Sequence, residues 1–169
     1  ALCREAIPRG IKALRTLMLK ECPDSRDEMA WVSLCGGLAL ANAGLGVIHG
    51  LAGPLGGLSN AAHGALCGSL LPFGLALNET QVNDEKIRQR FADVRQWLAA
   101  GLDVDPNDAW ESLREWSQRA GLGNLRELGV PREALEPAAL AASSSSSMKA
   151  NPVVLTSEQL LEMLEAAWE

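Results

Sequence analysis

Residues 29–78 read MAWVSLCGGLALANAGLGVIHGLAGPLGGLSNAAHGALCGSLLPFGLALN, and this stretch contains no Asp, Glu, Lys or Arg. It holds both histidines of the chain, His49 and His63, which lie 14 positions apart. A continuous apolar run of this length, without alternating β-branched residues, predicts buried helices. The Gly/Pro-rich residues 53–57 predict a turn that brings the two imidazoles back toward each other. A metal ion is one ligand that such a pair could share.

The rest of the chain shows the apolar spacing of amphipathic helices, and no run of alternating β-branched residues indicates a strand. A final helix is expected to follow Thr156, which forms a capping-box pattern with Gln159. Together these patterns predict an all-α fold, a helical bundle of roughly seven to nine helices. The other expected helices cover residues 2–19, 27 to 49 or 50, and 61–77, followed by apolar stripes that begin at Ile87 and Ala109.

Local signals place the starts of the two central helices. Ser25, with Glu28 three residues later, is a capping-box pattern for the helix that ends near His49. That helix is apolar on all sides, so we expect it to be buried at the centre of the bundle. Asn60 is the expected N-cap of the next helix and places His63 in its first turn. The positive end of a helix disfavours a protonated ring, which would help keep His63 available as a ligand.

Three interpretations of the charge-free stretch remain open. The first is a transmembrane hairpin, because residues 29–48 reach the roughly 20 apolar residues that cross a bilayer. Scattered glycines and the lack of Lys/Arg clusters or aromatic belts disfavour it, so we expect no membrane partner. The second is a plain helical core with two satisfied buried histidines. The third is a metal site, favoured by the glycines beside both histidines, which let other groups approach closely.

Composition sets further limits on fold and partners. The chain has 169 residues, enough for one domain with a hydrophobic core. Its net charge of −6 and pI near 5.0, without a basic stripe, argue against nucleic-acid binding. The four cysteines show no CxxC motif or regular framework, so we expect free thiols, no disulfides and a reducing, cytoplasmic location.

Two segments resemble the signature region of the iron-containing (group III) alcohol dehydrogenases: NAGLGVIHGLAGPLGG (42–57) and NAAHGALCGSLLPFGLALN (60–78). The family pattern runs roughly NAGLGxxHxxAHPLGG, then PHG, an apolar run and LLPH, and it ends in Asn. LRELGVP (125–131) and NPVVLT (151–156) extend the similarity to most of the chain. In that family the two histidines at this spacing are metal ligands, and by position they correspond to His49 and His63.

The resemblance implies the C-terminal, all-helical metal-binding domain of a dehydroquinate synthase-like architecture. It implies Fe²⁺ or Zn²⁺ as the metal, NAD or NADP as the cofactor and an alcohol or aldehyde as the substrate, and it allows a homodimer. The family's other two ligands, an Asp and a His on one helix, precede the matched region, as does its N-terminal dinucleotide-binding domain. Residues 1–169 are therefore expected to form a single helical domain with an incomplete metal site, inactive as an isolated fragment.

Two positions depart from the family pattern and leave the substrate unassigned. Gly53 stands where many relatives have a third histidine, and Phe73 replaces the histidine of LLPH. Cys67, one turn after His63, is a conceivable third ligand, although a small buried thiol explains it equally well. The alternative function is a non-catalytic helical interaction protein derived from the same family, in which His49 and His63 are merely packed.

Overall fold

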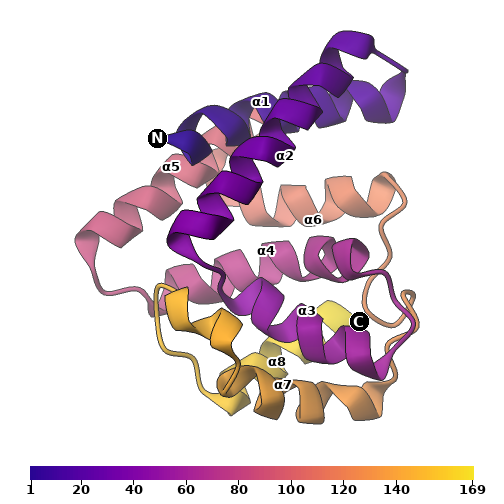
Figure 1. Ribbon diagram of the computed structural model, residues 1–169, viewed down its shortest axis with the longest axis vertical. Helices are drawn as coiled ribbons and strands as arrows, with labels where there is room; N and C mark the ends of the chain where they lie inside the picture. Colours follow the sequence, from indigo (N-terminus) through magenta and orange to yellow (C-terminus); the bar gives the residue numbers. More distant parts are fainter.

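The computed structural model describes all residues, 1–169, and consists of helices without any strand (Figure 1). The all-α prediction is confirmed, and the number of α-helices lies within the predicted range. The eight α-helices are α1 (Leu2–Leu19), α2 (Pro23–Ala43), α3 (Val47–Leu58), α4 (His63–Gln81), α5 (Glu85–Leu102), α6 (Ala109–Arg119), α7 (Leu135–Ser143) and α8 (Ser157–Trp168). Three short 3₁₀ helices are η1 (Pro106–Asp108), η2 (Arg132–Ala134) and η3 (Ser146–Ala150).

Two hydrophobic clusters hold these helices together. The larger cluster lies among α3, α4, α7 and α8, where Leu51, Leu66 and Leu160 are completely buried. The smaller cluster lies among α1, α5 and α6 and includes Ile11 and Trp110. Because α4 contacts both α6 and α8, it joins the two clusters through the middle of the molecule (Figure 1).

The long helix predicted over 27 to 49 is in fact two helices. α2 ends before Gly44 and α3 begins at Val47, with a bend of 101° between them. Gly44 has φ +75° and ψ −164°, a backbone region that is essentially restricted to glycine. A Cβ at Gly44 would lie 2.9 Å from the Cβ of Ala150. The bend lets Asn151 accept a hydrogen bond from the Val47 N–H at 3.0 Å, so a distant segment caps α3.

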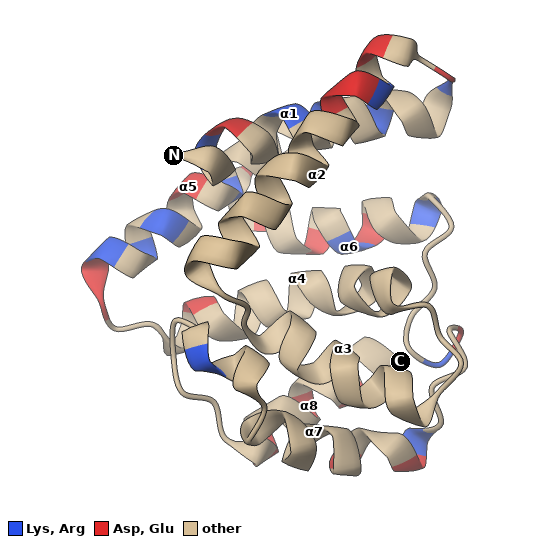
Figure 2. Ribbon diagram, viewed as in Figure 1, with Lys and Arg blue, Asp and Glu red and all other residues tan.

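The prediction that this apolar helix is buried on all sides is wrong for α2. Only Ser25 and Cys35 of α2 are buried, whereas Leu34 is 61% exposed. α2 packs mainly against α1, and the two helices project from one end of the molecule (Figure 1). Figure 2 shows that the second half of α2 carries no charge although it lies at the surface. Absence of charge therefore did not indicate burial here.

The predicted capping box at the start of α2 does not form. α2 begins at Pro23, before Ser25, and no side chain caps its first turn. Glu28 instead accepts two hydrogen bonds from Arg9 of α1, at 2.6 and 2.7 Å. An ion pair between helices has thus replaced a local cap.

The other two predicted helix starts have opposite outcomes. α4 begins at His63, and Ala62 rather than Asn60 is the residue at its N-cap. At α8 the predicted capping box is confirmed, because the Thr156 hydroxyl accepts from the Gln159 N–H and the Gln159 side chain accepts from the Thr156 N–H. Of the predicted caps, only the one at Thr156 forms in the folded chain.

A polar cluster joins α4, α5 and α6 beside the smaller core. The Glu79 carboxylate accepts hydrogen bonds from Arg95 at 2.5 to 3.0 Å and from the Trp110 ring N–H at 2.7 Å. The hydrogen bonds from Arg95, with the further one from Trp110, lower the pKa of the Glu79 carboxyl group below its ordinary value. One carboxylate therefore ties three helices together.

No helix of the chain is by itself long and apolar enough to span a bilayer. α2 and α3 reach the required length and hydropathy only when they are counted together across their bend of 101°. Residues 29–48, considered above as one spanning segment, are divided between these two helices.

Candidate metal centre

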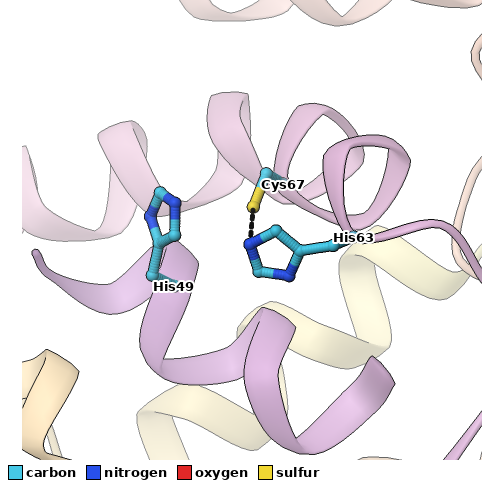
Figure 3. Close-up of side chains that lie close together, drawn as sticks. All are labelled: His49, His63 and Cys67. Carbon is cyan, nitrogen blue, oxygen red and sulfur yellow. Dashed lines mark hydrogen bonds between the residues drawn. The ribbon is translucent and has the colours of Figure 1, made fainter. Parts of the chain in front are cut away.

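His49 and His63 both lie in the first turn of a helix. His49 is the third residue of α3 and His63 is the first residue of α4. The expectation that His49 ends a helix is wrong, because the bend at Gly44 starts a new helix just before it. Figure 3 shows the two rings directed toward the same region between α3 and α4.

The turn that brings the histidines together lies at residues 59–62 and not at 53–57 as predicted. The glycines of 53–57 continue α3 because none of them has a positive φ. Ser59 follows the end of α3, where its hydroxyl donates to the Leu55 carbonyl at 2.8 Å and accepts from the Ala61 N–H at 3.4 Å. This short connection sets α3 against α4.

The imidazole rings are close enough to bind one ion. Their centroids lie 5.5 Å apart and the ring planes are tilted by 52°. Cys67, four residues after His63 on α4, joins them, with its Sγ 3.5 Å from the His63 Nε2 (Figure 3). One ligand atom from each of His49, His63 and Cys67 lies within 4.8 Å of the others. The predicted pair is thus brought together, and the structure adds a thiol to it.

The surroundings of the site favour neutral side chains. Burial, followed by the nearby His63 ring, lowers the pKa of the half-buried His49. Burial also raises the pKa of the Cys67 thiol. Because only the neutral imidazole has a free lone pair, the lowered pKa of His49 favours the form that binds a cation.

Asn151 and Asn78 fix the start of α3, and therefore the backbone that carries His49. The two side-chain amides exchange hydrogen bonds at 2.7 and 3.2 Å. Asn151 also accepts from the Val47 N–H and donates to the Val153 carbonyl at 2.9 Å. Both asparagines were quoted above within the resemblance segments, but nothing in the sequence indicated that they pair across 73 positions.

The fold and this cluster define a class of protein: an all-helical domain that directs two imidazoles and a thiol toward one point, as transition-metal sites do. Residues 1–168 match the Fe-containing alcohol dehydrogenase family, C-terminal domain, and the chain belongs to this family.

Individual relatives agree with this assignment. The chain is 29% identical over 167 residues to alcohol dehydrogenase 4 of Saccharomyces cerevisiae, a match that covers 95% of the chain and 43% of the relative. It is 32% identical over 148 residues to lactaldehyde reductase of Escherichia coli, covering 86% of the chain and 38% of the relative. A crystal structure of 1,3-propanediol oxidoreductase superimposes with a TM-score of 0.83 at 28% identity, covering 99% of the chain and 44% of that structure. The chain thus spans less than half the length of these relatives.

Proposed function

We propose that this chain is the metal-binding helical domain of a nicotinamide-dependent dehydrogenase that interconverts alcohols and aldehydes. In this proposal His49 and His63 bind one divalent ion, Fe²⁺ or Zn²⁺. The observation that carries the proposal is the convergence of the two rings, with centroids 5.5 Å apart, in a member of a family of alcohol dehydrogenases. Relatives named alcohol dehydrogenase and lactaldehyde reductase support the substrate class.

The chemistry of the donor set fits such an ion. Imidazole nitrogen suits both iron and zinc, and burial lowers the pKa of His49, which favours the neutral ring that binds a metal. A bound divalent ion supplies Lewis-acid polarisation of an alcohol or aldehyde oxygen. Two neutral nitrogen ligands add no negative charge, so they hold the ion without reducing its attraction for that oxygen.

The rest of the catalytic apparatus lies, in this proposal, in the part of the relatives that this chain does not span. That part would bring the dinucleotide, NAD or NADP, and the family's remaining metal ligands. The 169-residue chain, mixed with NAD or NADP, Fe²⁺ or Zn²⁺ and short alcohols, should therefore show no metal-dependent turnover. Robust turnover by this chain alone would contradict the proposed division of labour.

Metal retention tests the histidine pair directly. The chain is loaded with Zn²⁺, passed through a desalting column and analysed for bound metal. Because two histidines alone make an incomplete site, we expect the wild-type chain to retain only part of the zinc, and the His49→Ala and His63→Ala variants to retain clearly less, with unchanged helical circular dichroism. Asn107→Ala, which removes an exposed side chain on η1, is the control and should retain metal.

A second candidate function is a non-catalytic helical interaction protein of the same family. The exposed apolar side chains of α2 favour it, since Leu34, Leu38 and Leu40 are 61%, 45% and 44% exposed. The metal experiment separates the two candidates. Equal zinc retention by the wild-type chain and by a chain that lacks both histidines would favour the interaction protein.

A further inference from the structure

We propose that Cys67 is a third metal ligand, which makes His49, His63 and Cys67 a His₂Cys site suited to zinc rather than iron. This inference rests on the proposed function of the histidine pair and extends it to a residue of this chain that the family pattern does not include. A three-ligand set would let the chain bind an ion by itself, because three protein ligands plus one open position are the usual composition of a catalytic zinc site.

The distance between His63 and Cys67 is the one that a shared zinc ion requires. Zn–N and Zn–S bonds of about 2.0 and 2.3 Å at a tetrahedral angle place the two ligand atoms about 3.5 Å apart. The His63 Nε2 and Cys67 Sγ atoms are 3.5 Å apart. No movement along α4 is needed for these two ligands to share one ion.

The helix geometry explains why the two side chains meet. Residues four apart on a helix lie on the same face one turn apart, and His63 and Cys67 have this spacing on α4. His49 approaches from α3 across the short connection, and its ligand atom lies within 4.8 Å of the other two. Tetrahedral ligand atoms lie about 3.3–3.5 Å apart, so a shift of at most about 1.5 Å at the His49 side chain brings all three into reach of one ion.

A role as simple core filler accounts less well for the Cys67 side chain. Cys67 contacts the edge of the larger hydrophobic cluster but is only partly buried. Its Sγ lies in hydrogen-bonding contact with the His63 ring and faces the space shared with His49 (Figure 3). A thiol that served only to fill the core would be expected to direct its sulfur into that cluster.

The thiol also determines which metal the site prefers. A thiolate is a soft ligand that favours zinc over Fe²⁺, whereas imidazole accepts both. When Sγ binds the ion, the S–H bond breaks and the proton passes to solvent, so no oxidant or reductant is needed. In this chain by itself, the exposed side of His63 leaves the fourth position accessible to water or to one further ligand.

Cobalt(II) binding to the 169-residue chain tests the proposal with a readout that is independent of activity. Cobalt occupies tetrahedral N/S sites as zinc does, and a Co²⁺–thiolate bond gives a charge-transfer absorption in the near ultraviolet. We expect this band in the wild-type chain and its loss in Cys67→Ala. Cys22→Ser is the control and should keep the band, because Cys22 is a half-buried cysteine at the distant end of α2. Zinc competition should show that Cys67→Ala weakens binding by about 100-fold or more, since even second-shell partners change metal affinity by about 10–100-fold.

A conservative variant separates ligation from structure. Cys67→His supplies a nitrogen ligand at the same position, so it should restore zinc binding without the thiolate band. It should also reduce the preference for zinc over Fe²⁺, measured under anaerobic conditions. Circular dichroism of every variant shows whether its helices are intact.

The possible results distinguish the role of Cys67 from the role proposed above for His49 and His63. Cobalt bound by the wild-type chain without a thiolate band, and with equal affinity in Cys67→Ala, would overturn the role of Cys67 and leave the histidine pair in place. A folded wild-type chain that binds neither cobalt nor zinc would overturn the three-ligand site but not the histidine pair, whose remaining ligands lie, in the proposed function, outside this chain.

Discussion

At the residue scale, the sequence identified the two histidines but not the groups that position them. His49 and His63 are the only histidines of the chain, and the prediction that they meet is confirmed, although the turn between them lies at residues 59–62 and not in the glycine-rich residues 53–57. Asn78 and Asn151 could not be found in this way, because a pair 73 positions apart exists only in the folded chain. The spacing of Cys67 from His63 is visible in the sequence, but its distance from the His49 ring depends on how α3 lies against α4.

Replacing Asn151 by Ala should weaken both the fold and the metal site. The change leaves the Val47 N–H and the Asn78 amide without their partner, so we expect a loss of about 1–3 kcal/mol in the free energy of unfolding. Zinc affinity should fall with it, because the first turn of α3 carries His49. Chemical denaturation and zinc titration measure the two effects. Asn107→Ala is the matched control, and equal stability of the two variants would contradict the role assigned to Asn151.

At the element scale, most helices were predictable and the bend between α2 and α3 was not. Apolar spacing located α1, α5 and α6, and a one-turn capping box located the start of α8. Residues 42–49 kept the same apolar character through Gly44, so the pattern gave no sign that one helix ends there. The chain bends at Gly44, and the hydrogen bond from the Val47 N–H to the Asn151 side chain holds the start of α3, a distant contact that no local pattern reports.

Gly44→Ala should destabilise the chain by about 1–3 kcal/mol. Its backbone conformation is open almost only to glycine, and the added Cβ would meet Ala150. Gly37→Ala is the matched control within α2, where a Cβ has open space and alanine is the better helix former, so stability should rise by about 0.5–1 kcal/mol. Urea denaturation of both variants checks the opposite signs. If both variants were stabilised, the bend would not depend on Gly44.

The Glu79 cluster predicts how the contact of α4 with α5 and α6 responds to acid. The folded pKa of Glu79 lies below the unfolded value of about 4.3, so its contribution to stability is present above that value. This contribution of Glu79 to stability is lost as the pH falls through the pKa that Glu79 has in the folded chain. The free energy of unfolding of Glu79→Gln should therefore depend less on pH than that of the wild-type chain in this acidic range. Glu136→Gln, which removes an exposed carboxylate, is the control.

At the scale of the whole molecule, fold class was predictable and the distribution of burial was not. Helical periodicity established an all-α chain, because it depends only on neighbouring residues. Burial depends on what packs against a helix: α3 and α4 are covered by α7 and α8, whereas α2 is covered mainly by α1. The exposed part of residues 29–78, in α2, and the buried part, in α3 and α4, are equally free of charged residues, so composition could not distinguish them.

Two leucine substitutions test the difference in burial between α2 and α3. Leu34→Glu on α2 should change the free energy of unfolding by no more than about 0.5 kcal/mol, because the side chain is 61% exposed. Leu51→Ala on α3 removes a completely buried side chain and should cost about 2–5 kcal/mol. Thermal and urea denaturation measure both. Unfolding of the chain by Leu34→Glu would restore the original prediction of a buried central helix.

We propose that His49, His63 and Cys67 hold one ion between α3 and α4. X-ray absorption spectroscopy at the zinc edge of the loaded chain tests it most directly. We predict two nitrogen ligands at about 2.0–2.1 Å and one sulfur ligand at about 2.3 Å, with the sulfur signal lost in Cys67→Ala. A zinc ion surrounded only by oxygen and nitrogen, with a spectrum unchanged when His49, His63 or Cys67 is replaced, would contradict the claim.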